Sequence, residues 1–579
     1  MAVETETSGV PTPGPGGRHA PATRRTRLLQ AASRRGFIRV WYAFILGFFL
    51  VLVLLPTLFV LGYVVSGWGI IQDRVLTDPT LTDPIGPALG LSFGVALVVA
   101  GIDLLAGLPL AWLLVRYQFR GKDWLNTLID SPLAVTTAGL GFSVVLFWGV
   151  APGLTGVLPG AAALTRNPFL ILIFLHLTTT FPYMVRSLAA ILEEIEIEYE
   201  NAARAAGASR LTAVRTITLP MFRSGMATGL ILVLAKALSD TGGAYTALFL
   251  IGSCTPAETV CNGTGLINLW KAGRDATPEL NQALALVSAL MIVLSLILLV
   301  VVKYSALRLH FPLKRVWPLV ERRLSRGAAP LAKNVGSFAF LVLLILVPSF
   351  FFLLFTVVAS PTQTLEWERF WSSVGVSFLI GGVATAIDLG VGVPMGILIT
   401  RGRIRWLGRI LDALVNVPYI VPSAALGISL ALFWGQLLVL PDLVLVAMAH
   451  VAFTFPFVVR NVVGALEQLD PALEETARTL GAKPVQAFTR VTFPSIRPAI
   501  LAGSIMAFTR SVGETGATVS VVGPRLETVP VYIVNLITNP DPARRDYYGA
   551  ALAQVVLLVV SFAAILGMRL AVQRRRRRG

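Results

Sequence analysis

Four charged side chains stand inside otherwise apolar stretches of this 579-residue chain, in two pairs with the same spacing. Lys236 precedes Asp240 by four residues and Arg510 precedes Glu514 by four, so each pair shares one face of a helix. A charge inside a membrane costs at least about 2.5 kcal/mol, and such charges usually face a partner or a water-filled cavity. Each pair is therefore expected either to form an internal salt bridge or to line a pathway for a solute.

Two histidines and two aspartates also recur at matching places in apolar segments. His176 and His450 each precede a Thr-Phe-Pro sequence by four residues, and we expect them to be structural, hydrogen-bonded across a helix that proline loosens. The alternative is that they line the pathway. Asp103 and Asp388 stand four residues before a Gly-x-Pro break, where a role in packing and helix bending is expected.

The sequence contains no signature of an enzyme. It has no G-x-x-x-x-G-K-[S/T] phosphate loop and no cluster of metal-ligating residues, so we expect neither bound nucleotide nor a metal or other cofactor in this chain. The two cysteines, Cys254 and Cys261, are separated by six residues in a loop expected outside the cell. In an oxidising exterior they suit a small disulfide-closed loop, with free thiols as the alternative.

A polar loop occurs twice. Residues 176–223 reappear at 450–497, always 274 positions later, with 17 of 48 residues identical. Each copy predicts a short helix, a left-handed turn at Gly207 or Gly481, and a second short helix. Pro220 and Pro494 then mark the entry to the next membrane helix. A duplicated polar surface indicates a duplicated docking task, although two amphipathic helices resting on lipid are the alternative. The candidate docking residues are Glu200, Asn201, Ala202, Ala203, Arg204, Gly207 and Pro220, then Glu474, Glu475, Ala477, Arg478, Gly481 and Pro494.

The elements that position these residues are membrane helices. Apolar residues make up 55% of the chain and charged residues only 14%, and the mean hydropathy is +0.75. We therefore predict an all-α, polytopic membrane protein in which prolines break or tilt the third and ninth spans. The twelve predicted spans are 39–65, 87–115, 124–150, 168–190, 224–250, 281–302, 334–358, 374–400, 409–435, 442–465, 499–522 and 547–570.

Charge and repetition predict how the spans are organised. The net charge of +17 is concentrated in three segments between or beyond the spans, which places both termini in the cytoplasm of a plasma-membrane protein and argues for lipid rather than nucleic acid as the partner. Six spans per repeat give two halves of the same orientation, related by a pseudo-twofold axis along which a solute would pass. The predicted parts are a disordered cytoplasmic tail at 1–36, permease units at 37–302 and 334–570, a cytoplasmic linker at 303–333, and a basic end at 571–579.

The duplicated loop resembles the signature loop of permease subunits of ABC importers, which reads E-A-A, three residues, G, nine residues, I, one residue, L-P. The first loop departs from it at Asn201, where the family usually has glutamate, although Glu200 is adjacent. This resemblance implies that each loop is a coupling helix for one of two cytoplasmic ATPase subunits, which bind ATP, and that an extracytoplasmic binding protein delivers the solute. In register are Ala202, Ala203, Gly207, Ile217, Leu219 and Pro220, then Glu475, Ala477, Gly481, Val491, Phe493 and Pro494.

The solute is a small charged molecule whose identity the sequence leaves open. Residues 511–518 and 528–533 resemble the fifth-span region of sulfate, molybdate and tungstate permeases, whereas a fused double permease resembles ferric-iron and thiamine importers. The expected function is the transport subunit of an ATP-driven importer. An ion- or proton-coupled secondary transporter is the alternative, because it would explain Asp240 and Glu514, but it leaves the paired loops without a task.

Overall fold

The computed structural model describes residues 35–149, 164–271, 277–308, 329–359, 366–402, 404–437, 440–521, 526–539 and 541–577. These residues form helices joined by short connections, with one isolated β-bridge between Cys254 and Thr259. The prediction of an all-α membrane protein is thereby confirmed. The predicted tail and linker lie largely outside the described residues, and the basic end does so in part.

The helices of the first half are α2 (Arg35–Phe48), α3 (Leu55–Ser66), α4 (Trp68–Ile70), α5 (Pro79–Thr82), α6 (Ile85–Arg116), α7 (Lys122–Asp130), α8 (Thr137–Trp148), α10 (Pro168–Glu194), α11 (Ile197–Ala205), α12 (Arg210–Ala213), α13 (Leu219–Met221), α14 (Arg223–Ser239), α15 (Gly242–Leu250), α16 (Gly263–Lys271) and α17 (Pro278–Arg308). Those of the second half are α19 (Ala329–Phe340), α20 (Val347–Val358), α21 (Trp367–Arg401), α22 (Arg405–Leu414), α23 (Val417–Ile420), α24 (Ser423–Leu437), α25 (Asp442–Gln468), α26 (Pro471–Thr479), α27 (Pro484–Ala487), α28 (Phe493–Val512), α29 (Gly516–Val521), α30 (Val529–Ile537) and α31 (Tyr547–Arg577).

Within the described residues, nine helices are long and apolar enough to cross a membrane, and three bent pairs raise the number to as many as twelve. The third and ninth predicted spans contain the sharpest bends. Helices α7 and α8 meet at 103°, as do the segments Arg405–Ile420 and Ser423–Leu437. Pro132 and Pro418 lie in the short helical turns at these breaks, as predicted, because proline cannot donate the hydrogen bond that a continuous helix needs.

Two predicted spans end earlier than the sequence suggests. The predicted span 224–250 is divided, because α14 ends at Ser239 and α15 is a separate short helix. The predicted span 499–522 likewise ends with α28, and α29 begins after a break. An acid at each break accepts a backbone N–H of the following helix: Asp240 from Gly243 at 3.4 Å and Glu514 from Ala517 at 3.0 Å. These carboxylates satisfy donors that helix continuation would otherwise use.

The two halves are interlocked through their first spans. Helix α3 packs against α24 of the second half, and α20 packs against α8 of the first. Ser429 donates to the Pro56 carbonyl at 2.6 Å and accepts the Val60 N–H at 2.9 Å, so that its hydroxyl replaces a helical hydrogen bond. The second half repeats this arrangement with Ser143, the Pro348 carbonyl at 2.7 Å and the Phe352 N–H at 3.1 Å.

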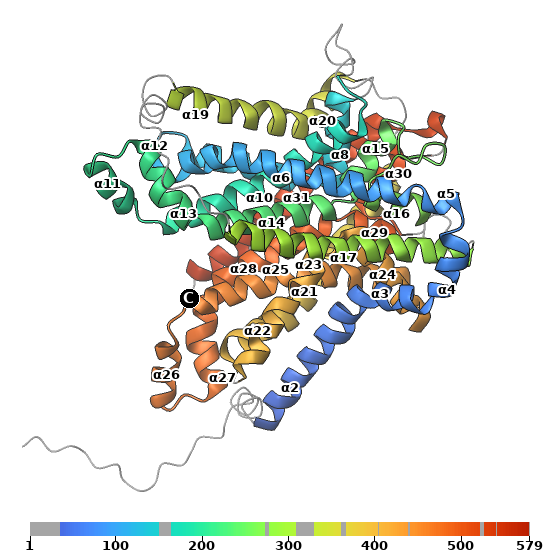
Figure 1. Cartoon of the computed structure of the whole chain (residues 1–579). Coiled ribbons are helices and arrows are strands. Elements are labelled where there is room, and N and C mark those ends of the chain that lie inside the picture. Colours follow the sequence, from blue (N-terminus) through green and yellow to red (C-terminus); the bar gives the residue numbers. More distant parts are fainter. Residues whose placement is uncertain are drawn as a thin grey trace, which may run out of the picture.

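The repeated polar loops project from one end of the bundle. We call residues 193–223 the first elbow and residues 467–497 the second elbow. Figure 1 shows α11 and α12 at the left of the view and α26 and α27 at the lower left, beyond the ends of the long helices. Behind each elbow the equivalent long helices pack together, α10 with α6 and α25 with α21. The elbows therefore share a face of the molecule, as two repeats of like orientation require.

Candidate functional site

Each elbow turns at a glycine in the left-handed region. Gly207 has φ +94° and Gly481 has φ +91°, conformations that a side chain would strain. The N–H of Ala208 binds the Ala203 carbonyl at 3.1 Å, and the N–H of Ala482 binds the Ala477 carbonyl at 3.0 Å. These are the hydrogen bonds of a Schellman motif, which ends one helix and redirects the chain into the next. The predicted helix-turn-helix is confirmed in both copies.

A glutamate fastens each elbow to the membrane helices. Glu200 is buried and accepts from Thr218 at 3.0 Å, and its carboxylate pairs with Arg116 at the end of α6 at 3.1 Å. In the second half, Glu474 accepts from Thr492 at 2.7 Å and lies 4.0 Å from Arg401 of α21. These two predicted docking residues thus fix the elbows in place and are only partly available to another protein.

The neighbouring predicted residues form the outer face of the elbows. Leu480 has 84% of its surface exposed, which is unusual for a leucine outside a membrane-facing position. Ala203 and Ala477 are half-buried between their two helices, as is Pro220. The exposed members of the predicted set are Asn201, Ala202, Arg204, Gly207, Glu475, Arg478, Gly481 and Pro494.

An arginine on α10 and another on α25 hold the bent third and ninth spans, a role the sequence did not reveal. Arg186 donates to Asp130 at 2.8 and 2.6 Å and to Asn126 at 3.0 Å. Arg460 makes the equivalent contacts with an aspartate and an asparagine of the second half in exchanged order. They are Asp412 at 2.5 Å and Asn416 at 2.7 Å, which are equivalent to Asn126 and Asp130. The signal in the sequence is this acid–amide exchange at the same four-residue spacing.

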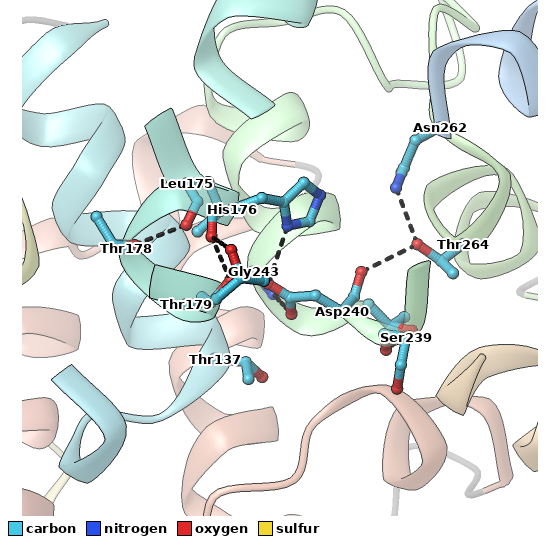
Figure 2. Close-up of polar contacts among 12 residues, drawn as sticks. Thr137, Leu175, His176, Thr178, Thr179, Ser239, Asp240, Gly243, Asn262 and Thr264 are labelled. Atoms are coloured by element: carbon cyan, nitrogen blue, oxygen red, sulfur yellow. Dashed lines mark hydrogen bonds and ion pairs between the residues drawn. The ribbon is translucent and has the colours of Figure 1, made fainter. Parts of the chain in front are cut away.

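The buried charge pairs differ between the halves. Arg510 and Glu514 form the expected internal ion pair. Lys236 and Asp240 do not. The Oδ2 atom of Asp240 instead lies 3.8 Å from Nδ1 of His176, and Figure 2 shows the imidazole ring facing this carboxylate. An internal ion pair therefore forms in the second half and not in the first.

The two histidines differ correspondingly. His450 is hydrogen-bonded at both ring nitrogens, to Ser511 at 2.6 Å and to Thr518 at 2.8 Å, which is the structural arrangement that the sequence predicts. His176 is buried too, but its Nδ1 atom lacks a hydrogen-bond partner among the described residues. The Asp103 carboxylate accepts from Thr180 of α10 at 2.6 Å, which gives it the packing role expected between neighbouring spans.

A cavity of about 240 Å³ lies between the two halves. Lys236 and Tyr183 of the first half border it, and Arg510, Phe457 and Thr509 border it from the second half. Among the described residues, no aspartate or glutamate borders this cavity or the smaller one beside it, although both cavities include Lys236 and Arg510. The charged side chains that line the larger cavity are therefore all cations. Elsewhere, too, the described residues contain no group of three or more side chains that could hold a metal ion.

A disulfide closes the loop between α15 and α16. Cys254 and Cys261 are bonded to each other, and the intervening chain folds back so that Cys254 pairs with Thr259 in the isolated bridge. Both cysteines are buried, whereas Val260 is 45% exposed. The loop lies at the end of the molecule opposite the elbows (Figure 1).

Comparison with known proteins places these features in a family. The family model for binding-protein-dependent transport system inner membrane components matches residues 103–312 and 392–578. The sulfate transport system permease protein CysT of Salmonella typhimurium is 32% identical over 251 residues, which is 39% of this chain and 88% of CysT. The molybdenum transport system permease protein ModB of Mycobacterium tuberculosis is 30% identical over 229 residues, 35% of this chain and 84% of ModB. The chain therefore belongs to the binding-protein-dependent permeases of ABC importers, as a transport subunit of the inner membrane that carries two family regions in one polypeptide.

Proposed function

We propose that this permease imports a small inorganic oxyanion of the sulfate or molybdate kind. The observation that carries this proposal is the cavity between the halves, whose charged side chains are Lys236 and Arg510 without an acid. Cations arranged in this way attract an anion, and the low dielectric of the surroundings strengthens the attraction. Ferric iron and thiamine are cations, which such a wall would repel. The similarity to CysT, a sulfate permease, and to ModB, a molybdenum permease, supports the same class of solute.

The elbows are the proposed contacts with two cytoplasmic ATPase subunits. Each elbow exposes, on its first short helix, the residue equivalent to the family glutamate: Asn201 in α11 and Glu475 in α26. Glu200 and Glu474 fasten the elbows to α6 and α21, which pack against α10 and α25. Because α10 and α25 border the cavity, a displacement of an elbow would be passed to it through these helix pairs. ATP would be bound by the partners. The face with the elbows, and both termini with it, would then be cytoplasmic.

The external face would receive the solute-binding protein. The loop closed by Cys254 and Cys261 lies on that face, and its disulfide suits an extracytoplasmic compartment. The two proposed permease units, 37–302 and 334–570, then form one pathway between them, with 303–333 as a cytoplasmic link.

Reconstitution tests the proposal. The permease, its ATPase and its binding protein are placed in proteoliposomes, and ATP-dependent uptake of radioactive sulfate, molybdate, ferric iron and thiamine is compared. We expect uptake of an oxyanion and not of either cation. Uptake of ferric iron or thiamine alone would refute the oxyanion assignment. Uptake driven by an ion gradient without the ATPase would favour a secondary transporter.

A further inference from the structure

The two halves leave their cavity-facing cations in different electrostatic states. Arg510, in the last turn of α28, is paired with Glu514, which lies four residues later in the break after that helix. Lys236 occupies the equivalent position on α14, yet within the described part of the chain its ammonium forms neither a hydrogen bond nor an ion pair, and no carboxylate oxygen lies within 4.0 Å of it. One wall of the cavity thus carries a cation held in an ion pair, and the other carries a cation on which Asp240 and Glu514 act only from beyond ion-pair distance.

Asp240, the acid four residues after Lys236, has its close contacts elsewhere. One carboxylate oxygen of Asp240 accepts the Gly243 N–H at 3.4 Å, and the other faces Nδ1 of His176 at 3.8 Å (Figure 2). Gly243 permits this position, because a Cβ there would lie 3.0 Å from the carboxylate. Asp240 is buried and does not border the cavity.

A sequence difference between the halves explains why a histidine faces the acid only in the first. His450 is held by the hydroxyls of Ser511 and Thr518. The equivalent positions, 274 residues earlier, are Ala237 and Ala244, which have no hydroxyl to offer. Nδ1 of the first-half imidazole therefore has no hydrogen-bond partner among the described residues, and it faces Oδ2 of Asp240, which also has none, at 3.8 Å.

We propose that Lys236 is the residue that binds the oxyanion in the cavity, and that His176 holds Asp240 away so that this lysine stays available. The inference rests on the proposed function of oxyanion import. An ammonium that is not already paired can make charge-assisted hydrogen bonds to oxyanion oxygens. Tyr183 borders both cavities beside Lys236, and its phenol is a second donor on the same wall. The cavity has room for several water-sized molecules, and hence for a tetrahedral anion.

The first test removes the charge at Lys236. Sulfate and molybdate uptake is measured in proteoliposomes that contain the permease, its ATPase and its binding protein. Lys236→Gln is expected to lower uptake about tenfold, the loss that accompanies one charge-assisted hydrogen bond, whereas Lys236→Arg retains most of it. Lys303→Gln, the same charge change at an exposed lysine of α17, serves as the control and is expected to transport normally.

The outcomes separate the two proposals. If wild-type complex takes up oxyanions and Lys236→Gln does so equally well, the binding role of Lys236 is refuted while the proposed function stands. If wild-type complex takes up neither sulfate nor molybdate, the proposed function itself fails, and the binding role falls with it.

A chemical rescue shows that any loss is due to the missing charge rather than to misfolding. The only two cysteines of the chain are bonded to each other, so Lys236→Cys introduces its single reactive thiol. Modification with 2-aminoethyl methanethiosulfonate restores an ammonium at this position and is expected to restore uptake. Methyl methanethiosulfonate adds a neutral group and is expected not to restore it. Equal behaviour of the two adducts would contradict the proposal.

The second test addresses the positioning role of His176. In His176→Phe, Asp240 loses the ring that faces it and is free to pair with Lys236, so uptake should fall. Adding Asp240→Asn removes the competing charge and should raise uptake at least about fivefold over the single variant, a coupling that independent sites do not show. The matched pair His450→Phe and His450→Phe/Glu514→Gln should show no such rescue. Failure of the first-half rescue would refute the positioning role.

Discussion

Thr515 of the second half packs against Gly242 of the first, so closely that a Cβ on Gly242 would lie 2.4 Å from the Cβ of the threonine. The reciprocal contact joins Thr241 to Gly516, where an added Cβ would lie 2.4 Å from the Cβ of the first-half threonine. Contacts that exchange in this way lie on the twofold axis that relates two repeats. The side chains of Thr241 and Thr515 therefore fill the space on this axis. Each threonine directly follows the acid of its helix break, Asp240 or Glu514.

Gly242→Ala is expected to open this contact, because the new methyl group and Thr515 cannot occupy the same space. Overpacking of this kind costs about 1–3 kcal/mol. If the threonines seal the pathway in this conformation, the variant should let sulfate leak through proteoliposomes without ATP. Passive efflux and thermal unfolding measure the two effects. Gly375→Ala, where the added Cβ meets nothing within 4 Å, is the control. If Gly242→Ala shows no passive sulfate efflux, Thr241 and Thr515 do not close the pathway.

The glycine turns of the elbows predict a coupling defect. Gly481→Ala places a side chain in the left-handed region, at a cost of roughly 1 kcal/mol to the second elbow. We expect reduced copurification of the ATPase and reduced ATP-dependent uptake. Gly464→Ala lies within α25 at an open position and should leave both unchanged. Normal uptake and ATPase binding in both Gly481→Ala and Glu475→Ala would remove the elbows from the coupling mechanism.

The arginine contact between α10 and α7 predicts a compensating pair of substitutions. Asp130→Asn leaves Arg186 without an acid and, because the pair is partly exposed, should cost only about 0.2–1 kcal/mol of stability. Adding Asn126→Asp restores an acid in the arrangement that the second half already uses with Asp412. Thermal unfolding of the double variant should return toward wild type. No recovery would indicate that the order of acid and amide matters in each half.

The disulfide predicts a protected external loop. Thiol-specific alkylation followed by mass spectrometry should modify neither Cys254 nor Cys261 until a reductant is added. The disulfide is expected to stabilise the folded protein by about 2 kcal/mol, because it lowers the conformational entropy of the unfolded chain. Cys254→Ser/Cys261→Ser should therefore weaken stimulation of the ATPase by the binding protein while basal ATPase activity persists. Alkylation of the wild-type protein without reductant would show that the thiols are free.

The sequence predicted the parts of the fold that depend on neighbouring residues: the membrane spans, the turns of the elbows and two of the helix breaks. Apolar segments of helical length marked the spans, and Gly207 and Gly481 marked the turns of the elbows, because only glycine takes φ near +94° without strain. Pro132 and Pro418 marked the breaks in the third and ninth spans. The ends of α14 and α28 were missed, because an apolar run continues past each break, and its cause is a carboxylate that binds the next helix.

Contacts between distant segments could not be read from the sequence. The i, i+4 spacing of Lys236 and Asp240 is the same as that of Arg510 and Glu514, yet only the second pair forms an ion pair. The group that faces Asp240 is instead His176, 60 positions earlier than the lysine, and alanines stand where the second half has the hydroxyls that bind His450. Similarly, the exchange of first spans between halves depends on surfaces that no periodicity distinguishes from lipid-facing ones.

That exchange constrains the order of events at the ribosome. The carbonyl of Pro56 and the N–H of Val60 are completed by Ser429, which is synthesised 369 residues after Val60. At roughly 5–20 residues per second, this corresponds to a delay of about 20 to 70 seconds. During cotranslational insertion the Pro56 carbonyl and the Val60 N–H therefore lack the hydrogen bonds of Ser429 for this time. A chain truncated before Ser429 would leave helix α3 permanently without these two hydrogen bonds.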